Sequence, residues 1–392
     1  MKKLVLFGAG KIGRSFIAQL FSRSGYEVVF IDIDKKVINA LNEKGEYKVV
    51  VKSEKGDNVI VVKNVRGILS TDTDTVTEEL SNADLVATSV GPNVIPRIIP
   101  ILTEGLRLRF KVSPKEPLDI ILAENLRDAA QIVKKEMRKY LPDSYDIDNL
   151  VGLVETSIGK MVPIIPDEVI ARDPLIVYAE PYNTLIIDKK GFKNSLPDVE
   201  GLAFKENMTA WVDRKSFIHN LGHAAAAYYS YSHYPDLIYL YEAVNKKDVK
   251  IFARKTMLQS ASVLMRHYPG EFTEKALIEH IDDLLYRFSN KALGDTIFRV
   301  GQDLFRKLGP EDRITGVLKL AVKYKLPYDK ILQTLKYAMK FKASDPSGNR
   351  SENDIKFTTL FEKEGTDYIL ENICMLDRMK YSEIYKEIAS ES

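Results

Sequence analysis

The stretch Leu4-Val5-Leu6-Phe7-Gly8-Ala9-Gly10-Lys11-Ile12-Gly13 decides the fold of the first half of this chain. A short apolar run, typical of a buried strand, passes directly into Gly-x-Gly-x-x-Gly and then into a segment of helical period, Ile12–Ser24. In such a unit the first glycine permits the tight turn, the second lets the backbone approach a pyrophosphate, and the third allows close packing of helix on strand. The amide groups at the helix start then bind the phosphates. We therefore predict a dinucleotide site formed by Gly8, Ala9, Gly10, Lys11, Ile12 and Gly13.

A second strand-like run, Val28–Ile31, ends in Asp32, at the distance of about twenty residues that a dinucleotide-binding βαβ unit requires. A carboxylate there accepts hydrogen bonds from both hydroxyls of the adenosine ribose and repels a 2′-phosphate, so we expect NAD rather than NADP. Asp34 either shares this role or caps the helix that begins at Lys35.

The turn that closes the run Leu85–Val90 is a second expected part of the cofactor site. Ligands of doubly wound sheets lie at the carboxyl ends of the strands, so Val90 and Gly91 are expected to line the cofactor. A plain strand-ending turn explains the same residues nearly as well.

Strand-like and helix-like segments alternate in the first half, and helical period dominates from Asn207 onward. We predict an α/β Rossmann-type doubly wound domain over residues 1–200 and an all-α domain over residues 201–392. Further strands are expected at Ile120–Ala123 and Leu150–Val154, a hairpin at Tyr47–Val51 and Val59–Val62, and a strand pair at Leu175–Glu180 and Thr184–Asp188. Helices are expected at Lys35–Glu43, Ala210–Tyr228, Lys247–Tyr268, Glu274–Phe288, Asp295–Leu308, Ile314–Lys323 and Tyr328–Phe341, with a loop at Asp345–Asn353.

The composition of the 392 residues excludes several classes of protein. The 57 basic and 55 acidic residues leave a net charge of +2, whereas nucleic-acid or membrane-surface partners call for a concentrated basic excess. No stretch approaches the ~20 apolar residues of a membrane span, and the apolar start stops at Gly8, far short of a secretory signal, so a cytoplasmic protein is expected. The single cysteine, Cys374, is expected in a C-terminal helix, and with five scattered histidines it offers no metal site.

The segment Asp213–His223 carries the most suggestive polar residues of the second half. On an α-helix Lys215, His223 and Asn220 would lie at about 0°, 80° and 140°, on one side of a helix. Its continuation, Ala224–Tyr229, is strongly apolar, and polar groups beside an apolar stripe often face a cavity. A solvated helix face explains the pattern about as well, and His219, at about 40° on the same arc, is an alternative to His223.

At these residues the chain resembles a known family. The spacing Lys215-x4-Asn220-x2-His223 is similar to the signature of the polyol-specific long-chain dehydrogenases and reductases. Further blocks follow in family order, from residue 1 to about residue 340: Gly8 to Arg14, Val90-Gly91-Pro92, Ala123-Glu124-Asn125, Asp173-Pro174-Leu175, Arg214-Lys215 with Asn220-x-Gly222-His223, and Arg299-Val300-Gly301 through Arg306-Lys307-Leu308.

The resemblance implies metal-independent hydride transfer between NAD and a small sugar alcohol or sugar phosphate, with mannitol 1-phosphate and fructose 6-phosphate as the expected pair. Lys215 would be the general base, which requires a pKa lowered toward neutrality. The amides of Asn125 and Asn220 would donate to the developing oxyanion, and His223 would hydrogen-bond a substrate hydroxyl.

A phosphorylated substrate needs cationic anchors, for which Arg299, Arg306, Lys307 and Arg313 are candidates. Arg299 matches the Arg-Val position of the family and is the predicted substrate residue. Acidic residues are interleaved with this set, and Asp295–Arg299 and Asp303–Lys307 have the i,i+4 spacing of surface ion pairs.

One position departs from the family pattern. The run Ile158-Gly159-Lys160-Met161-Val162-Pro163 has Gly159 where the family has an aspartate, and Glu155 is the nearest carboxylate along the chain. The departure keeps two alternatives open: a dehydrogenase of an unphosphorylated hexitol or hexuronate, and an NAD-binding protein without turnover.

Overall fold

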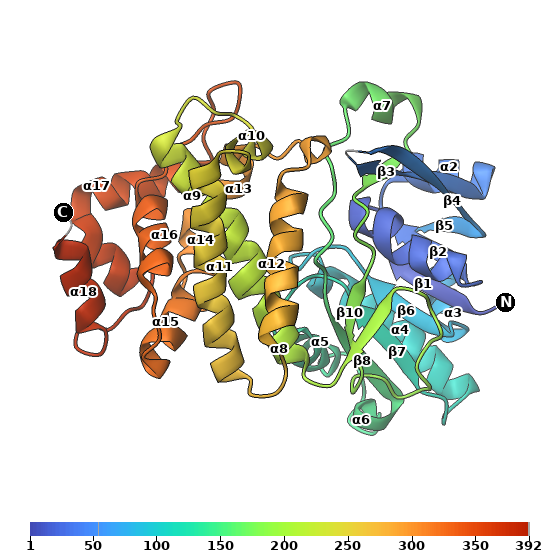
Figure 1. Cartoon of the computed structure of the whole chain (residues 1–392). Coiled ribbons are helices and arrows are strands. Elements are labelled where there is room, and N and C mark those ends of the chain that lie inside the picture. The colour runs from blue at the N-terminus through green and yellow to red at the C-terminus, as the bar shows by residue number, and fades with distance from the viewer. Residues whose placement is uncertain (54, 391–392) are drawn as a thin grey trace. The chain divides into compact units, whose positions relative to one another are not determined.

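The computed structural model of the protein describes residues 1–53 and 55–390. Its internal contacts divide the chain into two compact units, Met1–Val212 and a second that begins at Asp213. Figure 1 shows the labelled strands in the blue-to-green part of the chain, and within the described ranges every strand ends by Lys205. The predicted class, an α/β unit followed by a helical one, is confirmed.

An eight-stranded sheet forms the centre of the first unit, with the order β11-β10-β8-β7-β6-β1-β2-β5. Neighbouring strands are parallel except where β10 pairs with β8. The chain winds outward from β1 in both directions, and ligands of such sheets bind at the carboxyl ends of the strands beside this reversal. The strands are β1 (Lys3–Phe7), β2 (Glu27–Asp32), β5 (Val65–Leu69), β6 (Leu85–Thr88), β7 (Leu118–Leu122), β8 (Val151–Ser157), β10 (Leu185–Asp188) and β11 (Leu202–Lys205).

Side chains of β1 alternate between two apolar clusters, one on each face of the sheet. Leu4 and Leu6 join one cluster, Val5 and Phe7 the other, and all four are at most 2% exposed. Because both faces are covered, the strand is a continuous apolar run instead of an alternating one.

Helices of the first unit follow its strands. Asp34 caps α2, which is why this helix begins at the predicted Lys35, whereas the helix predicted over Ile12–Ser24 begins with a π-helical segment, η1. The helices are η1 (Gly13–Ala18), α1 (Gln19–Arg23), α2 (Lys35–Lys44), α3 (Thr73–Ser81), α4 (Ile95–Val112), α5 (Ala129–Met137), α6 (Ile147–Leu150) and α7 (Asp167–Arg172), while α8 (Met208–Arg214) begins in the first unit and ends in the second.

A small sheet of order β4-β3-β9 accompanies the large one. The predicted hairpin is present as β3 (Glu46–Ser53) and β4 (Gly56–Lys63). Both strands predicted at Leu175–Glu180 and Thr184–Asp188 are present, as β9 (Val177–Ala179) and β10, but their pairing with each other is wrong, because β9 pairs with β3 and β10 with β8. Strand β11 was not expected, and it carries the sheet past residue 200.

The second unit is helical, with two corrections to the expected elements. The helix predicted over Ala210–Tyr228 contains a π-helical segment, η2, and the helix predicted over Asp295–Leu308 is broken where Asp303 takes a positive φ of 75°. No range was predicted for helices α10, α17 and α18, although a C-terminal helix carrying Cys374 was expected. The elements are η2 (Lys215–Asn220), α9 (Leu221–His233), α10 (Leu240–Val244), α11 (Lys247–His267), α12 (Glu274–Phe288), η3 (Lys291–Leu293), α13 (Ile297–Gly301), α14 (Leu304–Lys307), α15 (Thr315–Tyr324), α16 (Asp329–Met339), α17 (Glu352–Asn372) and α18 (Ser382–Ala389).

Close helix packing fixes the second unit around α9. A side chain at Gly222 would overlap Met257 of α11, and one at Gly301 would overlap the ring of Phe341. Tyr228 is fully buried and donates from its hydroxyl to the Gly301 carbonyl at 2.9 Å. This packing holds η2, which directly precedes α9 in the same helical run.

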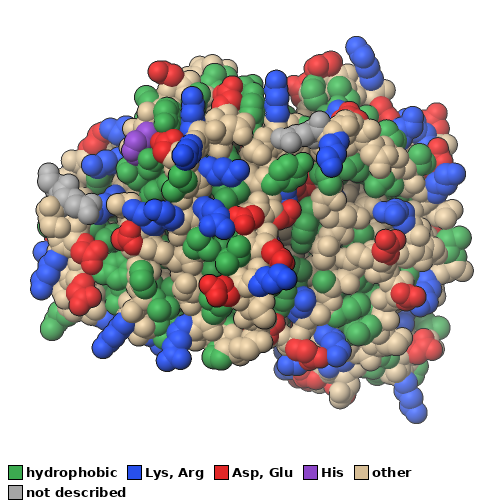
Figure 2. All heavy atoms as spheres, in the orientation of Figure 1, with side chains coloured by type: hydrophobic (Ala, Val, Ile, Leu, Met, Phe, Trp, Pro, Cys, Tyr) green, Lys and Arg blue, Asp and Glu red, His purple; other side chains and the backbone are tan. Residues whose placement is uncertain are grey.

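Cys374 is buried, but it follows the end of α17 instead of lying inside a helix. Within the described ranges, no helix combines the length and the apolar character needed to cross a membrane. Figure 2 shows Lys and Arg side chains intermixed with Asp and Glu over the face in view, as the nearly balanced charge of the sequence leads one to expect.

Candidate active site

The glycine turn between β1 and η1 is shaped by close backbone approaches. Gly8 has a φ of +99°, and a Cβ there would lie 2.5 Å from the Ser89 carbonyl oxygen. A Cβ at Gly13 would overlap the Gly8 carbonyl oxygen, so no larger residue fits while the turn keeps this form. A Cβ at Gly10 would meet nothing within 4 Å. The open space at Gly10 is what a ligand needs to reach the backbone of the turn.

Arg14, directly after the turn, was not among the predicted site residues. Its guanidinium is buried and donates to the Ala9 carbonyl at 2.7 Å and to the Pro174 carbonyl at 2.8 Å. The side chain therefore fixes the glycine turn to the segment before β9. Its place next to Gly13 and its position in the family block Gly8 to Arg14 are the signals that pointed to it.

Asp32 lies at the end of β2, and both of its carboxylate oxygens accept hydrogen bonds from backbone amides. Oδ2 accepts from Ala9 N at 2.6 Å and Oδ1 accepts from Asp34 N at 3.0 Å. Asp34 accepts from Lys36 N and Val37 N, so of its two possible roles the structure places it in the helix cap.

A cavity of about 700 Å³ opens beside this turn, within the size range of small-molecule sites. Gly8, Gly10, Asp32 and Val90 line it, whereas Ala9, Lys11, Ile12, Gly13 and Gly91 do not. Its other wall comes from α3 and α4, and includes the apolar side chains of Ile98 and Ile101. Sequence reasoning missed this wall, because nothing in the pattern of α4 separates residues that face the cavity from those that face the core.

The segment after β7 carries Asn125, whose φ of 53° is unusual for a residue other than glycine. Its Oδ1 accepts from Ile158 N at 2.8 Å. Within the part of the chain that the structure describes, its Nδ2 makes no hydrogen bond, and the residue is exposed. The carbonyl end of the amide is thus held by the backbone, which leaves the donor end available.

Lys215 begins the π-helical segment η2, and Asn220 ends it. The angles predicted for Lys215, Asn220 and His223 assumed an α-helix throughout, and that assumption is wrong here. In a π-helix the i→i+5 hydrogen bonds bring residues five apart nearly into line. Lys215 and Asn220 are five apart, so they lie closer in angle than an α-helix would place them. Single π-helical turns of this kind are frequent at functional sites.

The pKa of Lys215 is lowered to about 7. Burial is the main cause, followed by the positive charges of Arg313 and Arg306, while Asp312 acts in the opposite direction. An amine with this pKa is divided between its acid and base forms at neutral pH. Lys215 can therefore take up or release a proton there.

Both candidate histidines lie beside Phe288. The His223 ring stacks on Phe288 at 4.6 Å, and the His219 ring tilts against it at 5.7 Å. Burial, then the charge of Lys307, lowers the pKa of His223 to about 3, and burial holds that of His219 well below its usual range. Both rings are uncharged at neutral pH, so the approach of His223 Nε2 to Asp295 Oδ2, at 3.5 Å, is not an ion pair.

Exposure separates the two histidines. The His223 side chain is 18% exposed, whereas His219 is 5% exposed. His223 Nε2 is itself buried, and among the described residues it has no hydrogen-bond partner.

The predicted phosphate anchors are paired with acidic residues. Arg299 forms the expected ion pair with Asp295, and its side chain is 49% exposed. Asp312 lies between two arginines, since Arg313 Nε contacts it at 2.7 Å and Arg306 Nη1 at 3.3 Å.

The expected pair of Asp303 with Lys307 is wrong, because Lys307 points inward. Its Nζ donates to the Val300 carbonyl at 2.6 Å, and Asp303 pairs with Arg306 instead. Burial, with the charges of Arg313 and Arg306, lowers the pKa of Lys307 to about 7. The charges of Arg313 and Arg306 thus lower the pKa of both Lys307 and Lys215.

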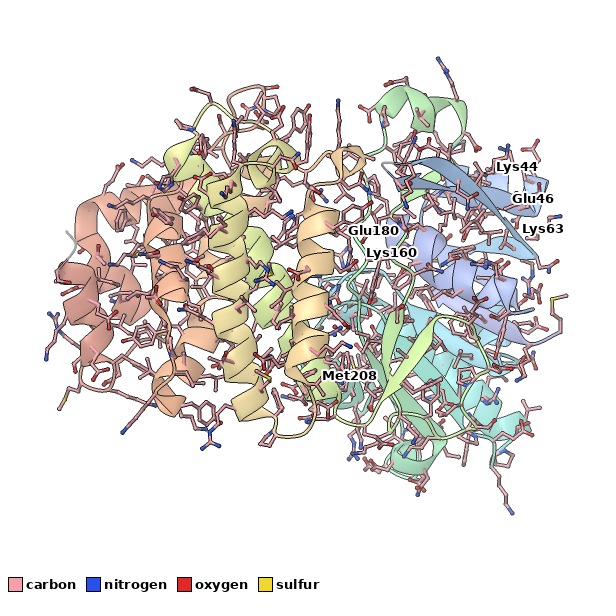
Figure 3. All side chains as sticks on the ribbon, viewed as in Figure 1. Lys44, Glu46, Lys63, Lys160, Glu180 and Met208 are labelled. Carbon is pink, nitrogen blue, oxygen red and sulfur yellow. The ribbon has the colours of Figure 1, made fainter. Side chains whose placement is uncertain are left out.

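Gly159 lies in the segment after β8, where a Cβ would meet the Tyr182 ring at 3.6 Å, an ordinary contact. Glu155 does not replace the missing carboxylate, because its Oε1 accepts from Ala130 N at 2.9 Å at the start of α5. Glu180, labelled with Lys160 in Figure 3, is a buried carboxylate that accepts from Met161 N at 2.5 Å. Lys160 Nζ donates to the Tyr182 carbonyl at 2.7 Å and to Asn183 Oδ1 at 2.9 Å.

Two family models match the chain. The mannitol dehydrogenase Rossmann domain matches residues 2–201, and the mannitol dehydrogenase C-terminal domain matches residues 207–389. The mannitol-1-phosphate 5-dehydrogenase of Bacillus subtilis (strain 168) is 32% identical over 375 residues, which cover 94% of each chain. The enzyme of the same name from Buchnera aphidicola (subsp. Acyrthosiphon pisum, strain APS) is 30% identical over 395 residues, 98% of this chain and 97% of that one.

Solved structures with low sequence identity share the fold. A mannitol 2-dehydrogenase of Pseudomonas fluorescens, in a ternary complex with NAD and D-mannitol, matches with a TM-score of 0.74 at 13% identity, over 100% of this chain and 92% of that one. A D-sorbitol dehydrogenase in substrate-free form also has a TM-score of 0.74, at 16% identity, over 89% of this chain and 82% of that one.

Proposed function

The chain belongs to the mannitol dehydrogenase family, and from this premise we propose that it is an NAD-dependent dehydrogenase that interconverts mannitol 1-phosphate and fructose 6-phosphate. The two family models together span both units. The Bacillus and Buchnera relatives, matched over more than nine-tenths of their length, are mannitol-1-phosphate 5-dehydrogenases, which supports a phosphorylated hexitol as substrate.

One observation carries the proposal: Lys215 has a pKa of about 7 because of burial and the cations around it. Oxidation of an alcohol needs a base for the hydroxyl proton, and a base works best with a pKa near the operating pH. In oxidation the neutral Nζ of Lys215 accepts that proton. In reduction its ammonium form returns the proton to the new hydroxyl.

The amides of Asn125 and Asn220 are proposed to donate to the substrate oxygen as it gains negative charge. Asn125 suits this role because the Ile158 amide holds its carbonyl end. His223 is proposed to bind a neighbouring substrate hydroxyl, which a neutral ring can do as donor or as acceptor.

The cavity beside the glycine turn is the proposed NAD site. The backbone from Gly8 to Gly13 would hold the pyrophosphate, with open space at Gly10, and Asp32 would hold the adenosine ribose. Val90 and Gly91 would line the same cofactor. NAD bound there would supply the hydride acceptor for oxidation and, in its reduced form, the hydride donor for reduction.

Arg299 is proposed to anchor the substrate phosphate. Only part of its guanidinium is engaged by Asp295, and an arginine has five donors, so a phosphate can be bound beside the carboxylate. Arg306 and Arg313 add positive charge that reaches Lys215.

A second candidate, an unphosphorylated hexitol or hexuronate as substrate, is favoured by the aspartate partners of Arg299, Arg306 and Arg313. Charges that already have partners are weaker phosphate anchors than free ones.

The test is oxidation of NADH by the purified protein with fructose 6-phosphate, fructose and a hexuronate, beside Lys215→Ala as control. We expect turnover with fructose 6-phosphate that the control lacks. Turnover with an unphosphorylated ketose or a hexuronate alone would replace the first candidate by the second. NADH binding without turnover of any ketose would instead identify an NAD-binding protein without this activity.

A further inference from the structure

Glu124 is a buried carboxyl group at the end of β7 that the proposed mechanism does not use. Its side chain is 8% exposed. Oε2 accepts from the Thr88 hydroxyl at 2.7 Å, and Oε1 accepts from Val90 N at 3.1 Å. Both partners belong to the neighbouring strand β6 and the turn that follows it.

These bonds begin where the strand pairing stops. The register of β6 with β7 ends at Thr88 and Leu122, and the last backbone bond runs from Ala123 N to the Thr88 carbonyl at 3.0 Å. Beyond that point the Glu124 side chain joins the two segments. It thereby holds the turn that contributes Val90 to the cavity wall.

The next residue, Asn125, makes the corresponding bond on the other side of β7. Its Oδ1 accepts from Ile158 N, directly after β8, which is the other neighbour of β7 in the sheet. Glu124 and Asn125 thus tie the end of β7 to both neighbouring segments. The distance between the Val90 wall and the Asn125 amide depends on these two side chains.

We propose that Glu124 is a positioning residue that fixes the turn of Ser89, Val90 and Gly91 relative to Asn125 and so keeps the cofactor cavity in its binding shape. The proposal rests on the proposed function in one respect, namely that this cavity binds NAD. Glu124 acts through the Val90 backbone and the Thr88 hydroxyl.

The proposed role of Glu124 depends on its two hydrogen bonds and does not depend on its charge. Burial raises the pKa of Glu124 to about 7, against the two hydrogen bonds that lower it, so both protonation forms occur near neutral pH. The ionised form accepts both bonds. The protonated form still accepts from Val90 N and donates its proton to the Thr88 hydroxyl, which can accept. A glutamine has the same shape and the same capacity as the protonated form.

The test compares NADH dissociation constants and melting temperatures of the full chain and its variants. We expect Glu124→Ala to raise the NADH dissociation constant about tenfold, because two hydrogen bonds to the turn are lost. Glu124→Gln is expected to stay within about twofold of the parent protein. Thr88→Val removes one bond at nearly constant shape and is expected to raise the constant about threefold.

Asp119 provides a matched control on the same strand. It lies at the opposite end of β7, is 1% exposed, and accepts from Lys193 N at 2.7 Å and Asn194 N at 3.2 Å. Asp119→Ala is expected to lower the melting temperature and leave the NADH dissociation constant unchanged. It measures what the loss of a buried carboxylate does to stability alone.

The inference is overturned if Glu124→Ala behaves like Asp119→Ala, with a lower melting temperature and unchanged NADH binding. It is also overturned if Glu124→Gln binds as weakly as Glu124→Ala, since the charge would then be required. If Glu124→Ala does not fold, the Thr88→Val and Glu124→Gln results decide. Failure of the proposed function alone has a different outcome: NADH binds and its dissociation constants follow the expected order, but fructose 6-phosphate is not reduced. A parent protein that binds no NADH contradicts both.

Discussion

Two regions of the proposed site contain a π-helical segment. The glycine turn after β1 leads into η1, and the polar segment that begins at Lys215 forms η2. In the turn, the geometry follows from contacts between residues that are near in sequence or on adjacent strands, such as Gly13 against the Gly8 carbonyl. Around Lys215, the decisive neighbours Arg306 and Arg313 come from 91 and 98 residues further along the chain. Local sterics shape the first region, and tertiary packing gives the second its chemistry.

The largest expected effect on activity is that of replacing Lys215, whose chemistry depends on tertiary packing. Lys215→Ala removes the proposed base, so kcat is expected to fall about 10³-fold, while the NADH dissociation constant stays within about twofold. Lys323→Ala, on exposed α15 surface, is the control and should keep full activity. A kcat within tenfold of the parent value would show that another group transfers the proton.

In the glycine turn, Gly10→Ala and Gly13→Ala distinguish the space that NADH needs from the space that packing of the protein itself needs. Both are expected to weaken NADH binding about 100-fold. A methyl group at Gly13 would overlap the Gly8 carbonyl and lower the melting temperature as well, whereas one at Gly10 meets open space and should leave stability nearly unchanged. Normal NADH binding by the folded Gly10→Ala variant would contradict the proposed pyrophosphate position.

The pH dependence tests the electrostatics of the second region. Because the pKa of Lys215 is lowered to about 7, its base form dominates above pH 7. Polyol oxidation should therefore rise about tenfold per pH unit below 7 and level off above it, while ketose reduction, which needs the acid form, should decline above pH 7.

Arg313→Gln sharpens this test. Removing a cation that lowers the pKa of Lys215 must raise that pKa. The pH range over which the rate of polyol oxidation rises, the limb of the profile, should therefore move to higher pH. An unmoved limb would mean that Arg313 does not act on the titrating group.

The smallest expected effect concerns cofactor choice at Asp32. Asp32→Ala removes the carboxylate that would repel a 2′-phosphate, so the preference for NAD over NADP is expected to fall about tenfold in kcat/KM. Asp34→Ala is the matched control: it loses only the α2 cap, at a stability cost of about 1 kcal/mol, and should keep the preference. Equal discrimination in parent and Asp32→Ala proteins would place cofactor selection elsewhere.

Parts of the fold and site were predictable because their cause is local. Gly8 to Gly13 and Asp32 stand where a dinucleotide-binding unit needs them, and α12 spans the predicted Glu274–Phe288. The partners of β9 and β10 were not predictable, because both runs are apolar and nothing local selects one sheet over the other. The break at Asp303 was missed for a similar reason, since Asp354, fifty-one residues away, holds the Asp303 amide.

What the sequence by itself determined is the class of each half, the glycine turn with its acidic partner Asp32, and the family resemblance carried by Lys215, Asn220 and His223. Backbone sterics and the period of apolar residues are properties of short segments, so they can be read without the fold. The tertiary structure alone decided the pKa of Lys215, the inward turn of Lys307, the hydrogen bond of Glu155 to the start of α5, and the link from Glu124 to Val90. Each of these depends on burial or on which groups meet across the fold, and no short segment contains that information.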